Sequence, residues 1–221
     1  MEKRMDKDVL LECKEIVKKY GSQIVLNGIN LDVKKGQGIA LVGENGCGKS
    51  TLVRIMAGLT QMTSGKCMYQ NQIKISYIPD HYDGLSFTFE EFMNETLKME
   101  GINDDYHKQK LQFYYEAFSL GNMIHTRMKN LSKGTLQKAA VIQSLIGEYD
   151  IIFMDEPLSG QDIHSQEMLM KEMLKRKKDG TSIVMACHER VFVEHTADEI
   201  YQIKDGKLVD GNDYLVSNIK E

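Results

Sequence analysis

A glycine-rich stretch, GENGCGKST at residues 43–51, constrains the fold more than any other part of the chain. The unbroken apolar run GIALVG precedes it, and KSTLVRIMAGL follows it with apolar residues at helical spacing. An unbroken apolar run is typical of a strand buried on both faces of a sheet. The sequence therefore predicts a buried strand, a glycine loop and a helix in direct succession.

The glycine loop matches the pattern G-x-x-x-x-G-K-[ST] in the strand and helix context that supports it. Its glycines let backbone N–H groups wrap phosphate oxygens, and the helix N-terminus adds partial positive charge. We expect Lys49 to meet the β- and γ-phosphates of a nucleotide and Ser50 to ligate Mg²⁺. The predicted nucleotide-binding residues of this loop are Gly43, Glu44, Asn45, Gly46, Cys47, Gly48, Lys49, Ser50 and Thr51.

Two further apolar strands end in residues that suit phosphate chemistry. IIFMDEP ends in Asp155 and Glu156, and TSIVMACHE ends in His188 and Glu189. Asp155 is the predicted Mg²⁺ ligand, and Glu156 is the predicted base that orients or deprotonates the attacking water. His188 is expected to hydrogen-bond the γ-phosphate or that water. Standing alone, these groups would be read as solvated strand caps or a structural histidine.

The remaining pattern indicates an α/β protein with a mostly parallel sheet, because strands alternate with helices. GINLDVKKG has the alternating pattern of an antiparallel strand, and EIYQIKDGKLVDGN predicts a hairpin at Asp205-Gly206. Residues 88–120 are expected to form two helices broken at GIND, with Thr88 and Glu91 as a capping box. We expect one domain over residues 1–221, with a helical subdomain at about 82–145.

Composition excludes several other classes of protein. The net charge of −4 means that the chain has no overall positive charge to attract nucleic acid, so no nucleic-acid partner is expected. The four cysteines form no CxxC pair and are far apart in sequence, which argues against a zinc cluster or a secreted disulfide framework. The N-terminus lacks a signal peptide's apolar core, and no stretch approaches the ~20 apolar residues of a membrane span. We therefore expect a cytoplasmic protein.

Six motifs occur in an order that resembles the nucleotide-binding domain of ATP-binding cassette (ABC) transporters, over roughly residues 9–210. They are Tyr20 before a strand pair, GENGCGKST, LSKGTLQ, IIFMDEP, LSGQD and ACHE. The resemblance implies a P-loop NTPase with an N-terminal antiparallel β-subdomain and a helical subdomain. It also implies that Tyr20 stacks on adenine, and that Ser132 and Gly134 of the signature turn cap the γ-phosphate bound by a second copy.

Two motifs depart from the family pattern. Asp80 stands where the family has a glutamine that senses Mg²⁺ and the membrane partner, and a carboxylate there remains a possible metal ligand. The signature reads LSKGT instead of LSGGQ, so Lys133 and Thr135 replace glycine and glutamine. Lys133 either adds charge toward phosphate or is simply an exposed lysine.

The resemblance implies an ATPase subunit of an ABC transporter that binds ATP and Mg²⁺. It implies a dimer, of two identical chains or with a homologous subunit, and a separate transmembrane permease that holds it at the inner face of the membrane. The compact length favours a bacterial exporter. A regulatory or interaction ATPase is the alternative, although its usual second cassette, coiled-coil insertion or zinc cysteines are not seen. A P-loop kinase would leave the signature and histidine segments unexplained.

Overall fold

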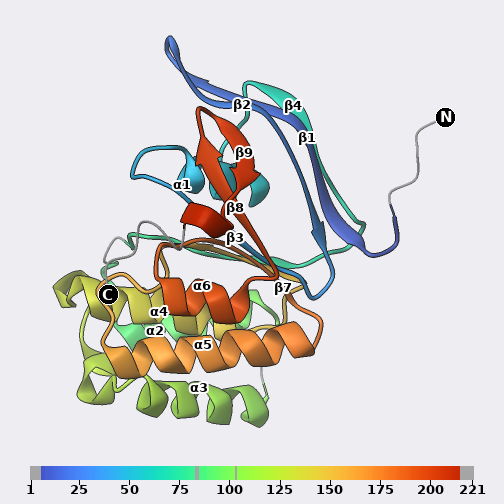
Figure 1. The fold of residues 1–221 in the computed structure, drawn as a ribbon. Coiled ribbons are helices and arrows are strands. Elements are labelled where there is room, and N and C mark those ends of the chain that lie inside the picture. Colours follow the sequence, from blue (N-terminus) through green and yellow to red (C-terminus); the bar gives the residue numbers. More distant parts are fainter. Residues whose placement is uncertain (1–5, 83–84, 103, 215–221) are drawn as a thin grey trace. The chain divides into compact units, whose positions relative to one another are not determined.

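The computed structural model describes residues 6–82, 85–102 and 104–214, which form two compact units. The first unit contains the chain up to Tyr77, Tyr149–Glu156 and the chain from Met173 onward. The second contains Ile78–Glu148 and Pro157–Glu172, so the expected helical segment at 82–145 falls within it. Figure 1 shows their helices and strands.

An antiparallel sheet in the first unit has the strand order β2-β1-β4. It consists of β1 (Val9–Tyr20), β2 (Gln23–Lys34) and β4 (Ser64–Tyr69), which run side by side in Figure 1. Ile29, Leu31 and Val33 of β2 are buried, whereas the alternating Asn30 and Asp32 are exposed. The predicted antiparallel strand is confirmed.

The second sheet is mostly parallel, and its strand order is β5-β6-β7-β3-β8-β9. The bounds are β5 (Ile75–Ile78), β6 (Ile151–Asp155), β7 (Ser182–Ala186), β3 (Gly38–Val42), β8 (Glu199–Lys204) and β9 (Lys207–Asp210). All residues of β3, β6 and β7 are buried, as their unbroken apolar runs predict. The predicted α/β class is confirmed. Helices α1 (Lys49–Met56) and α6 (Arg190–Thr196) follow β3 and β7 along the chain.

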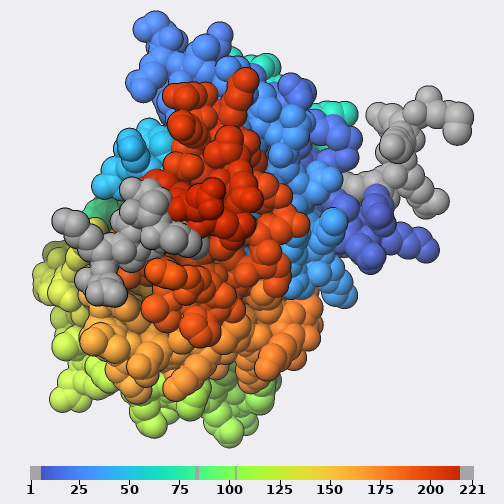
Figure 2. Space-filling model, in the orientation of Figure 1, coloured from blue at the N-terminus to red at the C-terminus, as the bar shows by residue number. Residues whose placement is uncertain are grey.

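Strands β8 and β9 pair antiparallel around Asp205 and Gly206, as predicted. The backbone N–H of Asn27 on β2 donates to the Gly206 carbonyl over 2.8 Å. In Figure 2 the red hairpin lies against the blue surface of the N-terminal strands. This hydrogen bond joins the turn of the hairpin to the antiparallel sheet.

The register of the parallel sheet brings three loops to one edge. Asp155 of β6 is opposite Ala186 of β7, and Ala186 in turn pairs with Leu41 of β3. Residues that follow these strands therefore emerge as neighbours at the carboxyl edge, where ligands of such sheets bind.

The second unit is mainly helical. It holds α2 (Phe89–Met99), α3 (Asp105–Ala117), the 3₁₀ turns η1 (Gly121–His125) and η2 (Met128–Asn130), α4 (Lys133–Ile146) and the first part of α5 (Ile163–Lys178). The Thr88 hydroxyl accepts from the Glu91 N–H over 3.2 Å, and the Glu91 carboxylate accepts from the Thr88 N–H over 2.7 Å. The predicted capping box and the break between two helices are confirmed. Within residues 6–82, 85–102 and 104–214, no helix is both long and apolar enough to cross a membrane.

Candidate functional site

The glycine loop joins β3 directly to α1, as the sequence predicts. Gly48 caps α1 with φ 115°, a conformation that L side chains rarely adopt. A Cβ atom at this position would also lie 3.0 Å from side-chain atoms of Val25 and Leu26. The path of the loop into the helix therefore requires glycine at position 48.

Lys49 extends its side chain into the loop. Its Nζ atom donates to the carbonyl of Gly43 over 2.8 Å and to that of Glu44 over 3.1 Å. Only 6% of the residue is exposed, and a buried ammonium requires such partners. Two backbone carbonyls therefore hold the cation inside the loop.

Asp155 at the end of β6 is fully buried and bonds to the start of α1. The Ser50 hydroxyl donates to its Oδ1 atom over 2.6 Å. Its Oδ2 atom accepts from the Tyr77 hydroxyl over 3.3 Å and lies 3.5 Å from a guanidinium nitrogen of Arg54. The hydroxyl and carboxylate are adjacent hard-oxygen donors, so this donor set fits Mg²⁺.

Tyr77 and Arg54 were missed by the sequence analysis. Arg54 follows Ser50 by four residues, so helical spacing alone places both on one face of α1. No local signal identifies Tyr77, because it reaches Asp155 through the pairing of distant segments. Burial raises the pKa of Tyr77 to about 12, which keeps its hydroxyl protonated and able to donate to Asp155.

Glu156 follows Asp155 in a strained backbone conformation, with φ 47°. Its N–H donates to the Ala186 carbonyl over 2.9 Å, and its Oε2 atom lies 2.9 Å from Nδ1 of His188. Burial raises the pKa of the Glu156 carboxyl, while His188 and Lys49 act in the opposite direction. The side chains of Glu156 and His188 are 22% and 60% exposed, so the pair is open to a reactant.

A cavity of about 530 Å³ adjoins the glycine loop at residues 43–51, which is called the phosphate loop from here on. It is lined by Glu44, Gly46 and Cys47 of the loop, by residues 23–25 of β2, by the β8-β9 turn and by Tyr214. The sequence analysis did not single out Tyr214. Tyr20 lies at the end of β1, 52% exposed, and is not among the described residues that line this cavity. The Lys18 ammonium is 4.7 Å from the centre of the Tyr20 ring.

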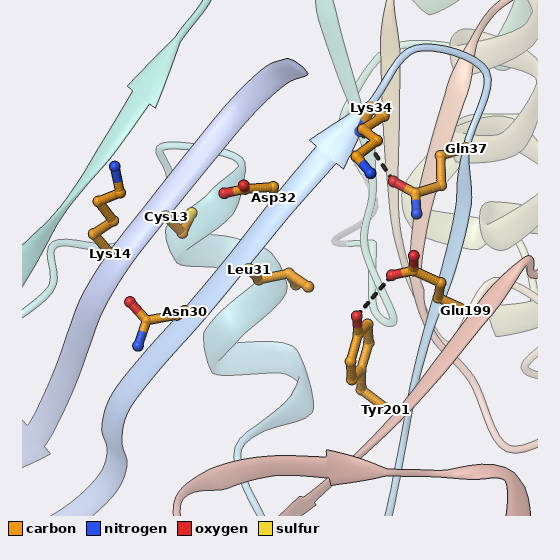
Figure 3. Close-up of a pocket in the computed structure, with 9 residues that line it drawn as sticks. All are labelled: Cys13, Lys14, Asn30, Leu31, Asp32, Lys34, Gln37, Glu199 and Tyr201. Carbon is orange, nitrogen blue, oxygen red and sulfur yellow. Dashed lines mark hydrogen bonds between the residues drawn. The ribbon is translucent and has the colours of Figure 1, made fainter. Parts of the chain in front are cut away.

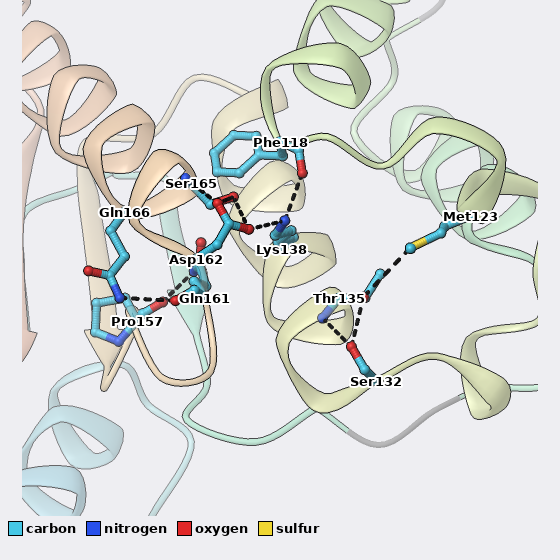
Figure 4. Close-up of polar contacts among 10 residues, drawn as sticks. All are labelled: Phe118, Met123, Ser132, Thr135, Lys138, Pro157, Gln161, Asp162, Ser165 and Gln166. Carbon is cyan, nitrogen blue, oxygen red and sulfur yellow. Dashed lines mark hydrogen bonds and ion pairs between the residues drawn. The ribbon is translucent and has the colours of Figure 1, made fainter.

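The signature segment belongs to the second unit and begins α4 (Figure 4). The Ser132 hydroxyl caps the helix by accepting from the Thr135 N–H over 3.2 Å, and the two hydroxyls are 2.8 Å apart. Ser132 and Lys133 are exposed, whereas Thr135 is buried. Thr135 therefore has a structural contact with the capping serine, and Ser132 remains open to a partner.

Gly134 packs against the turn that precedes α5. A Cβ atom at Gly134 would lie 2.0 Å from the carbonyl oxygen of Gly160, a distance that no side chain tolerates. Asp162 in the same turn caps α5 through Ser165 and forms a 2.7 Å ion pair with Lys138 of α4 (Figure 4). The Lys138 hydrogen bond holds the pKa of Asp162 well below its usual range. These contacts join LSKGT to LSGQD within the second unit.

The predicted site residues are thus divided between the two units. Residues 43–51, Tyr20, Asp155, Glu156 and His188 lie in the first unit. Asp80, Ser132 and Gly134 lie in the second. The structure brings Lys49, Ser50, Asp155, Glu156 and His188 together at one sheet edge.

A phosphate loop between a buried strand and a helix, facing an acidic strand end in a mostly parallel sheet, defines a P-loop NTPase. Within that class, the chain belongs to the ABC transporter family, whose family model matches residues 26–159. This match covers more than half of the chain and includes the phosphate loop, the signature turn and the acidic strand end.

Curated relatives are ATP-binding proteins of such transporters. An uncharacterized ABC transporter ATP-binding protein of Methanocaldococcus jannaschii is 28% identical over 90% of this chain and 76% of its own. The zinc import ATP-binding protein ZnuC of Rickettsia bellii is 29% identical over 88% of this chain and 82% of its own. The maltose/maltodextrin import protein MalK of Salmonella typhimurium is 28% identical over 90% of this chain, which spans 57% of that relative's length.

Solved structures share the fold. An ATP-binding subunit of an ABC transporter aligns with a TM-score of 0.82 and 25% identity, covering 90% of this chain and 88% of the other. A dimeric ATP-binding cassette in a post-hydrolysis state, bound to ADP and Pi, aligns with a TM-score of 0.78 and 23% identity, covering 90% and 96%. The chain is therefore built as an ATP-binding cassette.

Proposed function

We propose that this chain hydrolyses ATP to ADP and phosphate and that this reaction drives transport by a separate transmembrane subunit. The observation that carries the proposal is the 2.6 Å hydrogen bond between Ser50 and Asp155, beside the Glu156–His188 pair. It places the end of the phosphate loop against an acidic strand end. Family membership and the import relatives named above support the coupling to transport.

In the proposed reaction, Lys49, Glu156 and His188 of the first unit have distinct roles. Lys49 binds the β- and γ-phosphates from within the loop, and the loop N–H groups and the α1 N-terminus add positive potential. Glu156 accepts the proton of the attacking water, and its raised pKa improves it as a base near neutral pH. His188 holds the Glu156 carboxylate at 2.9 Å and is open enough to contact phosphate.

Ser50 and Asp155 are the residues of the first unit that would hold Mg²⁺, and the metal-ligand role of Asp80 stays a prediction from the sequence. The ion would neutralise charge on the phosphate oxygens during transfer. Tyr77 and Arg54 orient the Asp155 carboxylate from its far side, since both contact Oδ2 while Ser50 contacts Oδ1. Partners of this kind fix a metal-binding carboxylate in one orientation.

The 530 Å³ cavity beside the loop is the proposed site of the nucleotide base. Gly46 and Cys47 of the loop and Tyr214 all line this cavity. Tyr214 then supplies an aromatic surface for the base, whereas the stacking expected of Tyr20, which does not line this cavity, stays a prediction from the sequence. Aromatic contact of this kind is worth roughly 1–3 kcal/mol per base.

The proposed active form pairs two cassettes, either two copies of this chain or this chain and a homologous subunit. Ser132 is exposed at the N-terminus of α4, where its hydroxyl and the helix N–H groups can meet the γ-phosphate held by the partner's loop. We propose that residues 1–221 act as one nucleotide-binding domain at the inner face of the membrane, held there by the permease. The expected export direction stays a prediction, because the two transport relatives named above are import proteins.

Phosphate release from MgATP by the purified chain tests the proposed activity. Asp155→Asn should reduce the rate by about 100-fold or more, because it removes the carboxylate that faces Ser50. Asp179→Asn, at an exposed position after α5, is the matched control and should keep the wild-type rate. Equal rates for the two variants would contradict the proposed site. Transport in vesicles that also contain the permease tests coupling and direction.

A further inference from the structure

Two cysteines that are far apart in the sequence meet in the antiparallel sheet. Cys13 of β1 and Cys67 of β4 are direct cross-strand partners, and their sulfur atoms are 2.8 Å apart. Opposite residues of an antiparallel pair have Cα atoms about 4.5–5.5 Å apart, which lies inside the range that disulfides span. The sulfurs need to approach by only about 0.8 Å to reach bonding distance.

We propose that Cys13 and Cys67 form a site of reversible oxidation, in which a peroxide converts the two thiols into a disulfide that joins β1 to β4. None of the nucleotide contacts described above includes either residue, so the site is separate from the proposed ATPase reaction. The other two cysteines differ in setting. Cys47 lies in the phosphate loop, and Cys187 is fully buried at the end of β7, where burial raises the pKa of its thiol to about 12.

The two thiols have different surroundings, and the difference indicates which sulfur reacts with the peroxide. Cys67 is half-buried, and its hydrogen bond with Cys13 lowers the pKa of its thiol, so Cys67 is the nucleophile. Cys13 is 1% exposed, and the hydrogen bond to Cys67 and burial raise the pKa of its thiol. Asp32 and Glu12 act in the same direction. Figure 3 shows Cys13 and Asp32 among the residues that line a cavity, together with Glu199 and Tyr201 of β8.

The chemistry balances with hydrogen peroxide as the oxidant. The Cys67 thiolate attacks one peroxide oxygen, the O–O bond breaks, and hydroxide leaves while Cys67 becomes a sulfenic acid. The Cys13 sulfur then attacks the Cys67 sulfur, the S–O bond breaks, and the thiol proton leaves with the hydroxyl group as water. Two electrons pass from the two thiols to one peroxide, and a dithiol reductant returns them.

The disulfide would close a loop between positions 54 residues apart, and this loop contains the phosphate loop and α1. A bond of this kind stabilises the folded state by restricting the unfolded chain. We expect it to raise the Tm by about 5–15 °C and to be reversed by dithiothreitol.

Mass spectrometry of the full chain tests this inference. The reduced protein is treated with hydrogen peroxide, denatured, alkylated and digested. A linked peptide pair containing Cys13 and Cys67, lighter by two hydrogen atoms and accompanied by the rise in Tm, supports the proposal. Cys67→Ser should abolish both the link and the rise, and Cys47→Ser, the matched control for the other partly exposed thiol, should keep both.

Three results would overturn the proposal. In the first, all four cysteines remain alkylated after oxidation. In the second, Cys67 accumulates as a sulfinic acid without a link to Cys13. In the third, the disulfides join other cysteines or separate chains. Repeating the Tm measurement on Cys67→Ser under reducing conditions shows whether the variant is folded before oxidant is added.

Discussion

The Nδ1 atom of His188 lies 2.9 Å from Oε2 of Glu156, although the two residues follow different strands. Strands β6 and β7 are parallel neighbours in register from Ile151 and Ser182, so the residues after them emerge together. A cationic or hydrogen-bonding imidazole beside this partly buried carboxyl favours the ionised form and lowers its pKa, against the effect of burial. The ATPase activity should therefore depend on pH in a way that His188 controls.

Replacing His188 by alanine should move the acid limb of the ATPase pH profile to higher pH. Glu156 acts as a base only when ionised, so activity falls as pH drops through its pKa. Because His188 lowers that pKa, its removal raises it, and activity is lost at a higher pH than in the wild type. The measurement is kcat/KM for ATP across a pH range of about 5 to 9, which reports the pKa of the essential base in the free enzyme.

His195→Ala is the control for this profile, since His195 lies on α6 with its ring nitrogen bonded to the Val191 carbonyl. Its acid limb should match the wild type. A limb in His188→Ala that stays in place or moves to lower pH would show that His188 does not act on Glu156.

Tyr77→Phe should weaken the apparent affinity for Mg²⁺ by about 10-fold or more, because outer partners of metal-binding carboxylates have effects of this size. The change removes only the hydroxyl that donates to Asp155 over 3.3 Å. Titrating Mg²⁺ at saturating ATP gives the half-activation concentration. Tyr69→Phe, which removes a partly buried hydroxyl bonded instead to the Met56 carbonyl, is the matched control. Equal half-activation concentrations for both variants would exclude an orienting role for Tyr77.

Gly134→Ala should destabilise the protein by about 1–3 kcal/mol, the usual cost of forcing extra volume into a packed contact. The added Cβ would lie 2.0 Å from the Gly160 carbonyl, and both residues belong to the second unit. Urea unfolding measures the loss. The neighbouring Lys133→Ala, at an exposed position, should change the free energy of unfolding by less than about 0.5 kcal/mol. A Gly134→Ala protein as stable as the wild type would contradict this close packing.

Tyr214→Ala should raise the Kd for ATP by roughly 5-fold to 100-fold, which corresponds to the loss of one aromatic contact with a base. Tyr214→Phe keeps the ring and should bind ATP like the wild type. Equilibrium binding of ATP and of inorganic triphosphate separates the effect on the base from an effect on the phosphates. If triphosphate binding weakens as much as ATP binding, Tyr214 acts on the loop and not on the base.

The parts of the site that follow from the sequence are those built from neighbouring residues. The order of strand, glycine loop and helix places Lys49 and Ser50, and the capping signals place the start of α2. The joint position of Asp155, Glu156 and His188 also follows, because parallel strands share a carboxyl edge.

The parts that the sequence could not supply depend on pairing between distant segments. Tyr77 reaches Asp155 only because β5 lies beside β6, and Cys13 meets Cys67 only in one register of β1 and β4. The spacing of the four cysteines along the chain argued against a disulfide framework, and it carried no information about this cross-strand contact. Tyr214 likewise lines a cavity together with three other segments of the chain, two of which are distant from it in the sequence.

The central claim is that Ser132 of one chain completes the nucleotide site of a second chain. Glu156→Gln should bind ATP, lose about 100-fold or more of its turnover and accumulate as a dimer. Light scattering after size exclusion, with saturating MgATP, measures the mass of this variant. Adding Ser132→Arg to Glu156→Gln should return it to a monomer, while ATP binding by that monomer stays close to its original affinity. A Glu156→Gln protein that hydrolyses ATP at the wild-type rate, or remains monomeric with bound ATP, would contradict the account.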